Sequence, residues 1–281
     1  MSSTIQGAKQ TGANSGIDFS MAARPCFWLF GDSITQYCSK LEYTGWGLLL
    51  VDAYTSEYRC ADIVNRGLSG YNSRWGLMVL PKLLRQHAGE PPALVTIFFG
   101  ANDCVIPEAR QHVPLPEYKK NLQAMATVIR DAWPDAVVVF ITPPPVDVDK
   151  WDQAKGHLTK GQRSLENAGA YAEATVEAAA AAGCASLDLF SRIKAFEGGD
   201  PSAQGASRGE GWGTAWKDCL IDGLHLAEVG NRILFLALQE LVGELVPKLG
   251  ATDLPIHLPH HSDIPEACPG PYLLASHSDQ A

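Results

Sequence analysis

Five short apolar segments, separated by stretches with helical character, constrain the fold of this chain more than any other feature. The segments are rich in β-branched and aromatic residues, and each ends at a glycine, a proline or a polar cluster, which favours buried strands over helices. Because strands and helices alternate, we expect parallel strands joined by right-handed crossovers, with helices on both faces of one sheet. The sequence therefore predicts an α/β fold, a three-layer α/β/α sandwich. The expected strands span residues 27–30, 62–65, 93–99, 136–141 and 185–189.

The stretches between the expected strands carry helix-end signals or a single apolar face. An Ala- and Glu-rich stretch over 165–182 stops at Gly183, a residue that favours the ends of helices. Further helices are expected over 46–58, with Thr44 as a possible N-cap, and over 228–246. The i, i+4, i+7, i+11 spacing of one buried helical face is kept by Tyr118, Leu122, Met125 and Ile129.

These elements predict a single domain over residues 22–250. We expect residues 1–21 to form a flexible N-terminal segment, in which Met21 could be an alternative start, and residues 251–281 to form a Pro- and His-containing tail. Inside the domain, residues 198–213 contain six glycines, which is typical of a flexible surface loop.

The acidic composition disfavours several classes of partner. The chain has 22 basic and 31 acidic residues and a net charge of −9, which opposes binding to phosphate backbones and to anionic membranes. No apolar run reaches the roughly 18 residues of a membrane span, and the first 20 residues lack a signal-peptide core. We therefore expect neither a nucleic-acid nor a membrane partner.

Seven cysteines without a C-x-x-C pair indicate reduced thiols. Reduced thiols are typical of cytosolic proteins, so we expect a cytoplasmic protein.

Polar residues follow the strands at the edge of the sheet where ligands bind in open parallel sheets. Ser33 follows the first strand in a Gly-Asp-Ser triplet, Gly70 follows the second strand, and Asn102 follows the third. Asp222 and His225 follow the fifth strand, beyond the Gly-rich loop. A serine, a glycine, an asparagine, an aspartate and a histidine are thus expected at one edge, an inventory that suits nucleophilic acyl transfer.

Each of these residues has a chemical role in that reaction. A serine hydroxyl is a weak nucleophile and needs a base within hydrogen-bond reach, which His225 can supply to Ser33. Asp222, three residues before His225, can hold the other ring nitrogen and fix the tautomer. The tetrahedral oxyanion needs preorganised donors, and the candidates are the N–H groups of Ser33 and Gly70 and the side-chain amide of Asn102.

Each motif alone has a simpler interpretation. Gly-Asp-Ser is a common turn, and Asp-x-x-His can be a helix cap with an exposed histidine. Their occurrence in this order, all at strand ends, favours an active site. A catalytically silent binding module is the non-enzyme alternative, and the presence of all five residues argues against it.

The sequence resembles the GDSL or SGNH hydrolases over roughly residues 25–247. Ser33 in GDSIT, Gly70, Asn102 in GANDC, and Asp222 and His225 in DGLHL match the blocks of that family. The stretches FGDSITQ, NRGLSGYNSRW, VTIFFGANDC, RQHVPLPEYKKNL and ITPPPVD are similar to its isoamyl-acetate-hydrolysing esterase branch. The resemblance implies a flavodoxin-like sheet of order 2-1-3-4-5, a serine acyl-enzyme and ester hydrolysis without a cofactor. It does not cover the Gly-rich loop or the tail.

Several other residues could contribute to a site. Asp32 and Asp103 could act as paired carboxylates on a sugar, although we favour structural roles for both, and Asp32 is also a candidate for substrate binding together with Tyr71 and Arg74. Cys104 could be an accessible thiol, but burial is more frequent for free cysteine. An acyl or alcohol pocket could be lined by Trp46, Tyr71, Arg74 and Trp75, with core packing an equal alternative for the tryptophans.

Nucleotide and metal sites are less favoured. The chain lacks both G-x-G-x-x-G after a strand and G-x-x-x-x-G-K-[ST], which are the glycine-rich motifs of phosphate-binding loops. His257, His260, His261 and Asp263 could bind a metal, but prolines interrupt that segment, and a polar tail is the simpler interpretation. We expect no metal and no cofactor.

The expected substrate is a small, uncharged ester with a short acyl group, an acetate of a short or branched alcohol. This expectation rests partly on the resemblance. Deacetylation of sugars or other polar metabolites, and thioester hydrolysis, use the same machinery and remain alternatives. The sequence leaves the oligomeric state open.

Overall fold

The computed structural model describes residues 24–57, 60–87, 89, 91–156, 159–201, 213–245 and 249–250. The described residues belong to one compact unit, residues 24–255. The expected N-terminal segment with Met21, the tail and most of the Gly-rich loop lie outside the described residues, so those expectations stay predictions.

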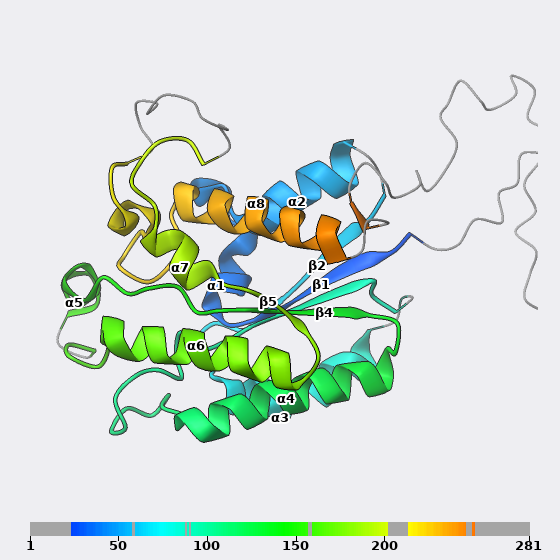
Figure 1. Ribbon diagram of the computed structural model, residues 1–281, viewed down its shortest axis with the longest axis horizontal. Helices are drawn as coiled ribbons and strands as arrows, with labels where there is room; N and C mark the ends of the chain where they lie inside the picture. The colour runs from blue at the N-terminus through cyan, green and yellow to red at the C-terminus, as the bar shows by residue number, and fades with distance from the viewer. Residues whose placement is uncertain are drawn as a thin grey trace, which may run out of the picture. The chain divides into compact units, whose positions relative to one another are not determined.

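A five-stranded, all-parallel sheet forms the centre of the fold (Figure 1). Its strand order is β2-β1-β3-β4-β5, the flavodoxin-like order that the resemblance implied. The predicted α/β fold with five parallel strands is therefore confirmed. The strands are β1 (Cys26–Gly31), β2 (Asp62–Gly67), β3 (Leu94–Phe98), β4 (Val137–Ile141) and β5 (Ala185–Leu187).

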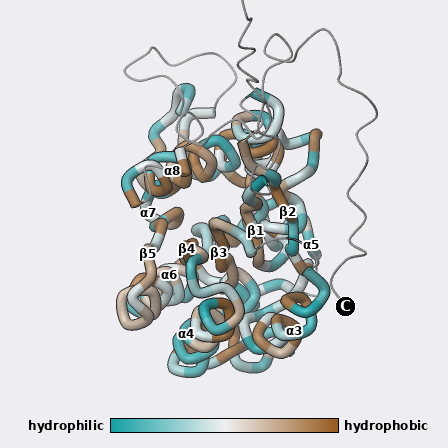
Figure 2. The backbone as a smooth tube through the Cα atoms, turned by 90° about the vertical axis from the view of Figure 1, so that its right-hand side faces the viewer, coloured by the Kyte–Doolittle hydropathy of each residue, from teal (hydrophilic) through white to brown (hydrophobic). Residues whose placement is uncertain are grey.

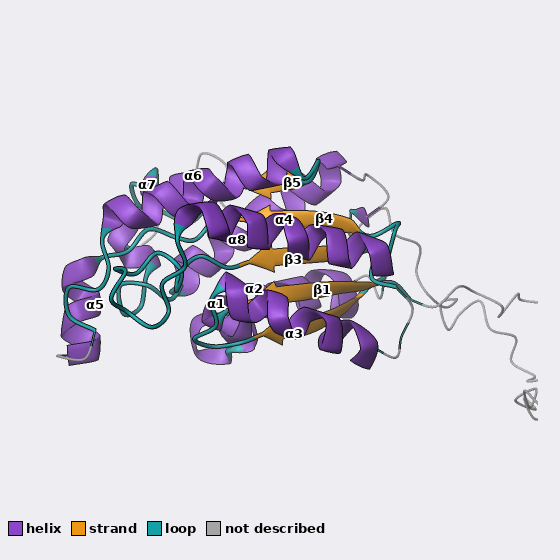
Figure 3. Ribbon diagram, turned by 90° about the horizontal axis from the view of Figure 1, so that it is seen from below, coloured by secondary structure: helices purple, strands orange, loops and turns teal. Residues whose placement is uncertain are grey.

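Helices cover both faces of the sheet (Figures 1 and 3). One face is covered by α3 (Ser73–Gln86), α4 (Leu115–Ala132) and α6 (Leu165–Ala181), and the other by α2 (Trp46–Leu50), α7 (Leu189–Lys194) and α8 (Glu228–Leu245). Two short helices, α1 (Ser33–Gln36) and α5 (Val148–Lys155), follow β1 and β4.

The hydrophobic core lies between the sheet and these helices, where Figure 2 shows the apolar parts of the chain facing inward. Every residue of β1 is buried, as expected for a central strand covered on both faces. The apolar helical face predicted from the sequence lies on α4 and is confirmed. All four residues of that face are less than about 2% exposed, namely Tyr118, Leu122, Met125 and Ile129.

Three local predictions need correction. The helix expected over 46–58 is α-helical only over α2 and continues as a π-helical stretch, Val51–Glu57. Its N-cap is Gly45, because Thr44 has a left-handed backbone, with φ of 46°. The strand expected to reach residue 189 ends at Leu187, since the side chain of Asp188 caps α7 instead.

Helices α3, α5 and α7 were not predicted. Pro81 lies inside α3 and obscures its periodicity, although the side chain of Asn72 caps the helix by accepting a hydrogen bond from the Trp75 N–H at 3.0 Å. The other two helices are only 8 and 6 residues long, too short to show a repeating apolar face.

Candidate active site

Three residues from distant parts of the chain form a continuous hydrogen-bonded chain beyond the carboxyl end of the sheet. The Nε2 atom of His225 lies 2.9 Å from the Oγ atom of Ser33. Its Nδ1 atom lies 2.8 Å from the Oδ2 atom of Asp222. A carboxylate can only accept, so the ring proton of neutral His225 is on Nδ1, and Nε2 is left to accept the serine proton. The structure thus brings together the serine, histidine and aspartate singled out in the sequence.

Ser33 is placed by the sharp change from strand to helix. It is the first residue of α1, directly after β1, and it is buried. The Oδ1 atom of Asp32 caps this helix by accepting the Ile34 N–H at 2.9 Å. Among the described residues no group accepts the Ser33 N–H, as expected at the start of a helix, where N–H groups lack intrahelical partners.

Asp222 and His225 lie on a tight turn before α8. Leu220 and Leu226 close this turn as an antiparallel bridge, and the Ile221 N–H donates to the His225 carbonyl oxygen at 2.8 Å. Gly223 has a φ of 93°, and a Cβ there would lie 2.4 Å from the Asp147 carbonyl oxygen. This position therefore favours glycine. The close approach packs the turn against the start of α5.

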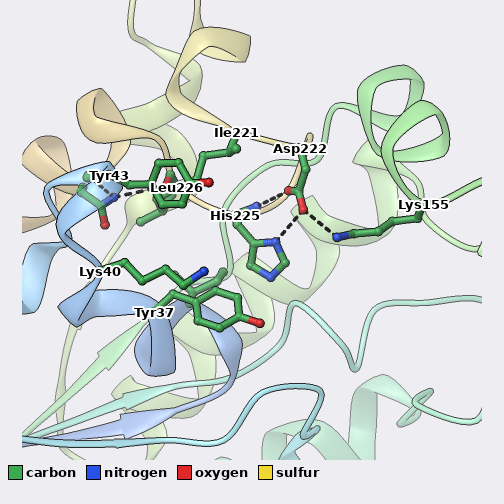
Figure 4. Close-up of a pocket in the computed structure, with 10 residues that line it drawn as sticks. Tyr37, Lys40, Tyr43, Lys155, Ile221, Asp222, His225 and Leu226 are labelled. Carbon is green, nitrogen blue, oxygen red and sulfur yellow. Dashed lines mark hydrogen bonds and ion pairs between the residues drawn. The ribbon is translucent and has the colours of Figure 1, made fainter.

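The carboxylate of Asp222 accepts hydrogen bonds from three residues, of which Figure 4 shows His225 and Lys155. Its Oδ1 atom accepts the backbone N–H groups of Leu224 at 3.2 Å and His225 at 2.9 Å. Its Oδ2 atom faces both the imidazole and the ammonium of Lys155, which lies 3.0 Å away. Burial opposes ionisation, but the hydrogen bonds and the charge of His225, together with the hydrogen bond from Lys155, prevail, so the pKa of Asp222 lies well below its usual range.

The candidate oxyanion donors converge on the same edge. Gly70 has a φ of 79°, a conformation that favours glycine, and among the residues that the structure describes no group accepts its N–H. The Asn102 Nδ2 atom donates to the Tyr71 carbonyl oxygen at 2.9 Å, which leaves one amide hydrogen for another acceptor. Ser33, Gly70, Asn102 and His225 line one cleft with a volume of about 210 Å³.

Further hydrogen bonds fix the loops that carry these donors. The Gln111 Nε2 atom donates to the Gly70 carbonyl oxygen at 2.8 Å, and the Asp103 Oδ1 atom accepts the Ser73 N–H at 2.8 Å. Asp32 and Asp103 are both fully buried, and burial raises the pKa of each carboxyl group to about 7. Asp32 thus bonds to the backbone of α1, which follows it, and Asp103 bonds to the first residue of α3.

A model of the GDSL-like lipase/acylhydrolase family matches residues 29–233. The chain belongs to this family. It is therefore a carboxylic ester hydrolase, as the resemblance in the sequence predicted.

Curated relatives extend the match over most of this GDSL hydrolase. The isoamyl acetate-hydrolyzing esterase 1 homolog of Mus musculus is 39% identical over 257 residues, which are 89% of this chain and 92% of that protein. A GDSL esterase/lipase of Arabidopsis thaliana is 36% identical over 247 residues, 84% of this chain and 92% of that protein.

Solved structures of the same fold are more distant in sequence. A lipase/acylhydrolase from Enterococcus faecalis has a TM-score of 0.54 at 22% identity and covers 79% of this chain and 96% of its own. An acetylxylan esterase from Geobacillus stearothermophilus has a TM-score of 0.56 at 18% identity, with coverage of 79% and 96%. At these identities the likeness shows the fold.

The expected substrate-binding residues of the hydrolase do not all reach the cleft. Asp32 is completely buried, and a buried carboxyl group cannot contact a bound ester. The Arg74 guanidinium instead forms two hydrogen bonds, of 2.6 and 2.7 Å, with the carboxylate of Glu117. Trp46 is fully buried in the core. Tyr71, by contrast, lies beside the cleft.

Tyr71 lines an open apolar hollow that adjoins the cleft at Ser33 and His225. The hollow has a volume of about 620 Å³ and shares Ser69, Gly70 and Gln111 with the cleft. Trp75, another residue suggested by the sequence, lines it as well. A second, more polar hollow lies next to the imidazole (Figure 4) and is lined in part by Tyr37, Lys40, Tyr43 and Lys155.

Two charged residues of the site, Lys155 and Arg163, were not identified from the sequence. Lys155 ends α5, and Arg163 directly precedes Ser164, the N-cap of α6. The Arg163 Nη2 atom donates to the Asn102 Oδ1 atom at 3.2 Å, and its Nη1 atom donates to the Ala101 carbonyl oxygen. Neither residue lies in a motif or at a strand end, so no local signal could have identified them.

Cys104 is buried, as expected. Within the described ranges, no group of three or more His, Cys, Asp or Glu side chains could hold a metal ion. His257, His260, His261 and Asp263 lie outside those ranges. Over the same part of the chain, no helix has the length and apolar character needed to cross a membrane.

Proposed function

We propose that the chain hydrolyses small, uncharged esters with short acyl groups through a Ser33 acyl-enzyme. The observation that carries this proposal is the 2.9 Å contact between Ser33 Oγ and His225 Nε2, continued at 2.8 Å to Asp222. These distances lie within the range over which a base can take a hydroxyl proton.

Acylation of the serine follows from this geometry. Ser33 Oγ attacks the ester carbonyl carbon while His225 Nε2 takes its proton, and the carboxylate of Asp222 stabilises the imidazolium that forms. The carbonyl oxygen becomes an oxyanion, which the N–H groups of Ser33 and Gly70 and the Asn102 amide stabilise. When the tetrahedral species collapses, the bond to the alcohol oxygen breaks, and that oxygen takes the proton from Nε2.

Deacylation repeats these steps with water. His225 takes a proton from the water molecule as its oxygen attacks the acyl carbon, and the same donors stabilise the second oxyanion. Collapse breaks the bond to Ser33 Oγ, which regains a proton from His225, and releases the carboxylic acid.

The preference for a short acyl group rests on the size of the cleft and on the relatives. The cleft of about 210 Å³ suits a small ester, and the mouse relative at 39% identity is named for isoamyl acetate. An extra methylene in a small acyl pocket would clash rather than gain the roughly 0.8 kcal/mol of its burial. The adjoining apolar hollow is the place where a longer chain would have to lie.

Deacetylation of a polar, hydroxylated alcohol is a second candidate, favoured by one observation. The cleft is lined by the polar side chains of Gln111, Lys155, Thr159 and Gln162 as well as by the catalytic residues. Such groups can hydrogen-bond an acetylated sugar but gain little from an aliphatic alcohol.

A panel of esters tests both candidates. We expect kcat/KM for p-nitrophenyl acetate and butyrate to exceed that for octanoate and palmitate, with a steep fall beyond about four acyl carbons. Isoamyl acetate, an acetylated sugar and an acetyl thioester complete the panel. Ser33→Ala is the control that identifies activity from this site.

The panel separates the outcomes. An optimum at octanoate or longer would contradict the short-acyl proposal and assign the hollow at Tyr71 and Trp75 to the acyl chain. A strong preference for the acetylated sugar would favour the second candidate, and a preference for the thioester would favour a thioesterase.

A further inference from the structure

Arg163 places a buried positive charge at the back of the catalytic cleft. Its side chain is only 6% exposed, yet it lines the cleft together with Ser33, Gly70 and Asn102. Within the described parts of the chain no carboxylate forms an ion pair with it. Burying an unpaired cation costs several kcal/mol of stability. The hydrogen bonds that Arg163 makes at this position must therefore offset that cost or serve the reaction.

Those contacts fix the loop that follows β3. The Arg163 guanidinium donates to the Ala101 carbonyl oxygen and, at 3.2 Å, to the Asn102 Oδ1 atom. Its centre lies 4.6 Å from the ring centroid of Trp151, which supports the cation through a cation–π contact.

The amide of Asn102 is thereby held at both ends. Its oxygen accepts from Arg163, and one hydrogen of its Nδ2 donates to the Tyr71 carbonyl oxygen at 2.9 Å. Together these bonds fix which end of the amide presents a donor to the cleft, because the guanidinium can only donate and so must face the oxygen. A bond from a cation also draws electron density from the amide and makes its N–H groups stronger donors.

We propose that Arg163 is a positioning residue for the oxyanion hole, acting through Asn102. This inference rests on the proposed function, in which Asn102 stabilises the oxyanion. Without Arg163 the amide can turn over and present its oxygen to the developing negative charge. Loss of Arg163 should therefore raise the energy of the transition state and hardly change the binding of the neutral ester.

A merely structural role for Arg163 makes a different prediction. In that case its contacts with Ala101 and Asn102 would tie the β3 loop to α6, and its removal would lower stability without changing turnover by a folded enzyme. Arg130 offers a matched control, because its guanidinium also donates to backbone carbonyl oxygens, those of Ala182 and Gly183, but outside the residues that line the cleft.

A double-mutant cycle with Arg163→Met and Asn102→Ala tests the proposal, using p-nitrophenyl acetate. We expect Arg163→Met alone to lower kcat about 10- to 100-fold, the effect of a lost charge-assisted hydrogen bond, with KM changed less than about twofold. In the Asn102→Ala background the same substitution should lower kcat less than about threefold, because residues that act as a unit are not additive. Arg163→Lys should recover part of kcat, and Arg130→Met should leave kcat unchanged.

Equal losses from Arg163→Met in the two backgrounds would overturn the proposal, as would a lowered Tm with unchanged kcat. Should Arg163→Met fail to fold by near-ultraviolet circular dichroism, the cycle is run with Arg163→Lys, and equal losses in its two backgrounds overturn the proposal likewise. Failure of the proposed function has another signature, namely full activity in Ser33→Ala.

Discussion

The ammonium of Lys155 lies 3.0 Å from the Oδ2 atom of Asp222, the same oxygen that faces the imidazole of His225. The carboxylate is therefore shared between a permanent cation and a ring that is charged only when protonated. Lys155 therefore helps to hold the carboxylate that orients the imidazole.

Replacing Lys155 should lower kcat and leave binding of the ester nearly unchanged. In Lys155→Met the Asp222 Oδ2 atom loses one of its two side-chain partners, so the carboxylate and the imidazole that it orients are held less firmly. We expect kcat for p-nitrophenyl acetate to fall several-fold, with KM changed less than about twofold. Steady-state kinetics measure both quantities.

Controls separate this effect from a general loss of surface charge. Lys155→Arg keeps a cationic donor beside Asp222 and should keep most of kcat. Lys119→Met removes a cation of α4 that pairs with Glu177 of α6, and it should leave kcat unchanged. An unchanged kcat in Lys155→Met would contradict this role of Lys155.

Asn102 should contribute to turnover and little to the fold. Removing one oxyanion donor typically lowers kcat by about 10²- to 10³-fold, so Asn102→Ala should show this loss with nearly unchanged KM and Tm. Steady-state kinetics and a thermal melt measure these quantities.

Asn231 is a matched control for Asn102. Its Oδ1 atom accepts the Trp46 N–H at 3.2 Å, and its Nδ2 atom donates to the Tyr43 carbonyl oxygen at 3.1 Å, so it joins α8 to α2. Asn231→Ala should lower Tm and leave kcat within a few-fold of wild type. If Asn102→Ala behaves in the same way as Asn231→Ala, then Asn102 is structural.

The features that could be predicted from the sequence are local or depend on burial. The five strands could be predicted because each is a short, continuous apolar run, and Ser33, Gly70, Asn102, Asp222 and His225 could be brought to one edge because parallel strands all end there. The strand ends themselves were less predictable. Asp188 caps α7 immediately after β5, and nothing in the apolar pattern marks that change.

The parts of the site that the sequence did not reveal depend on contacts between remote segments. Arg163 lies 61 residues from Asn102, and Lys155 lies at the end of a helix that was itself not predicted. A lysine or an arginine in such a segment is indistinguishable from a solvated surface charge until the fold places it. Conversely, Arg74 follows a motif block, but its partner Glu117, 43 residues away, holds it outside the cleft.

Stability should fall with rising pH through the buried carboxyl group of Asp103. Its pKa is raised to about 7 in the folded state by burial, against about 3.9 in an unfolded chain. The folded state therefore holds a proton that the unfolded state has lost, and the stability gained below about pH 4 disappears as the pH rises to 7. Asp103→Asn should remove a slope on the order of 1 kcal/mol per pH unit over this range.

Urea unfolding of wild type and Asp103→Asn at several values between pH 4 and 8 measures that slope. The exposed acid Asp131, at the end of α4, provides the control Asp131→Asn, which should unfold with the wild-type pH dependence. Parallel curves for wild type and Asp103→Asn would show that Asp103 is ionised in the folded protein.

The nucleophile itself is tested most directly by labelling with a fluorophosphonate, which forms a covalent bond to an activated serine. The account predicts stoichiometric modification of Ser33, located by peptide mass spectrometry, in step with complete loss of esterase activity. Ser33→Ala should take up no label and lose several orders of magnitude in kcat, and His225→Ala should react far more slowly. Modification of a different residue, or more than about a tenth of wild-type turnover in Ser33→Ala, would contradict the account.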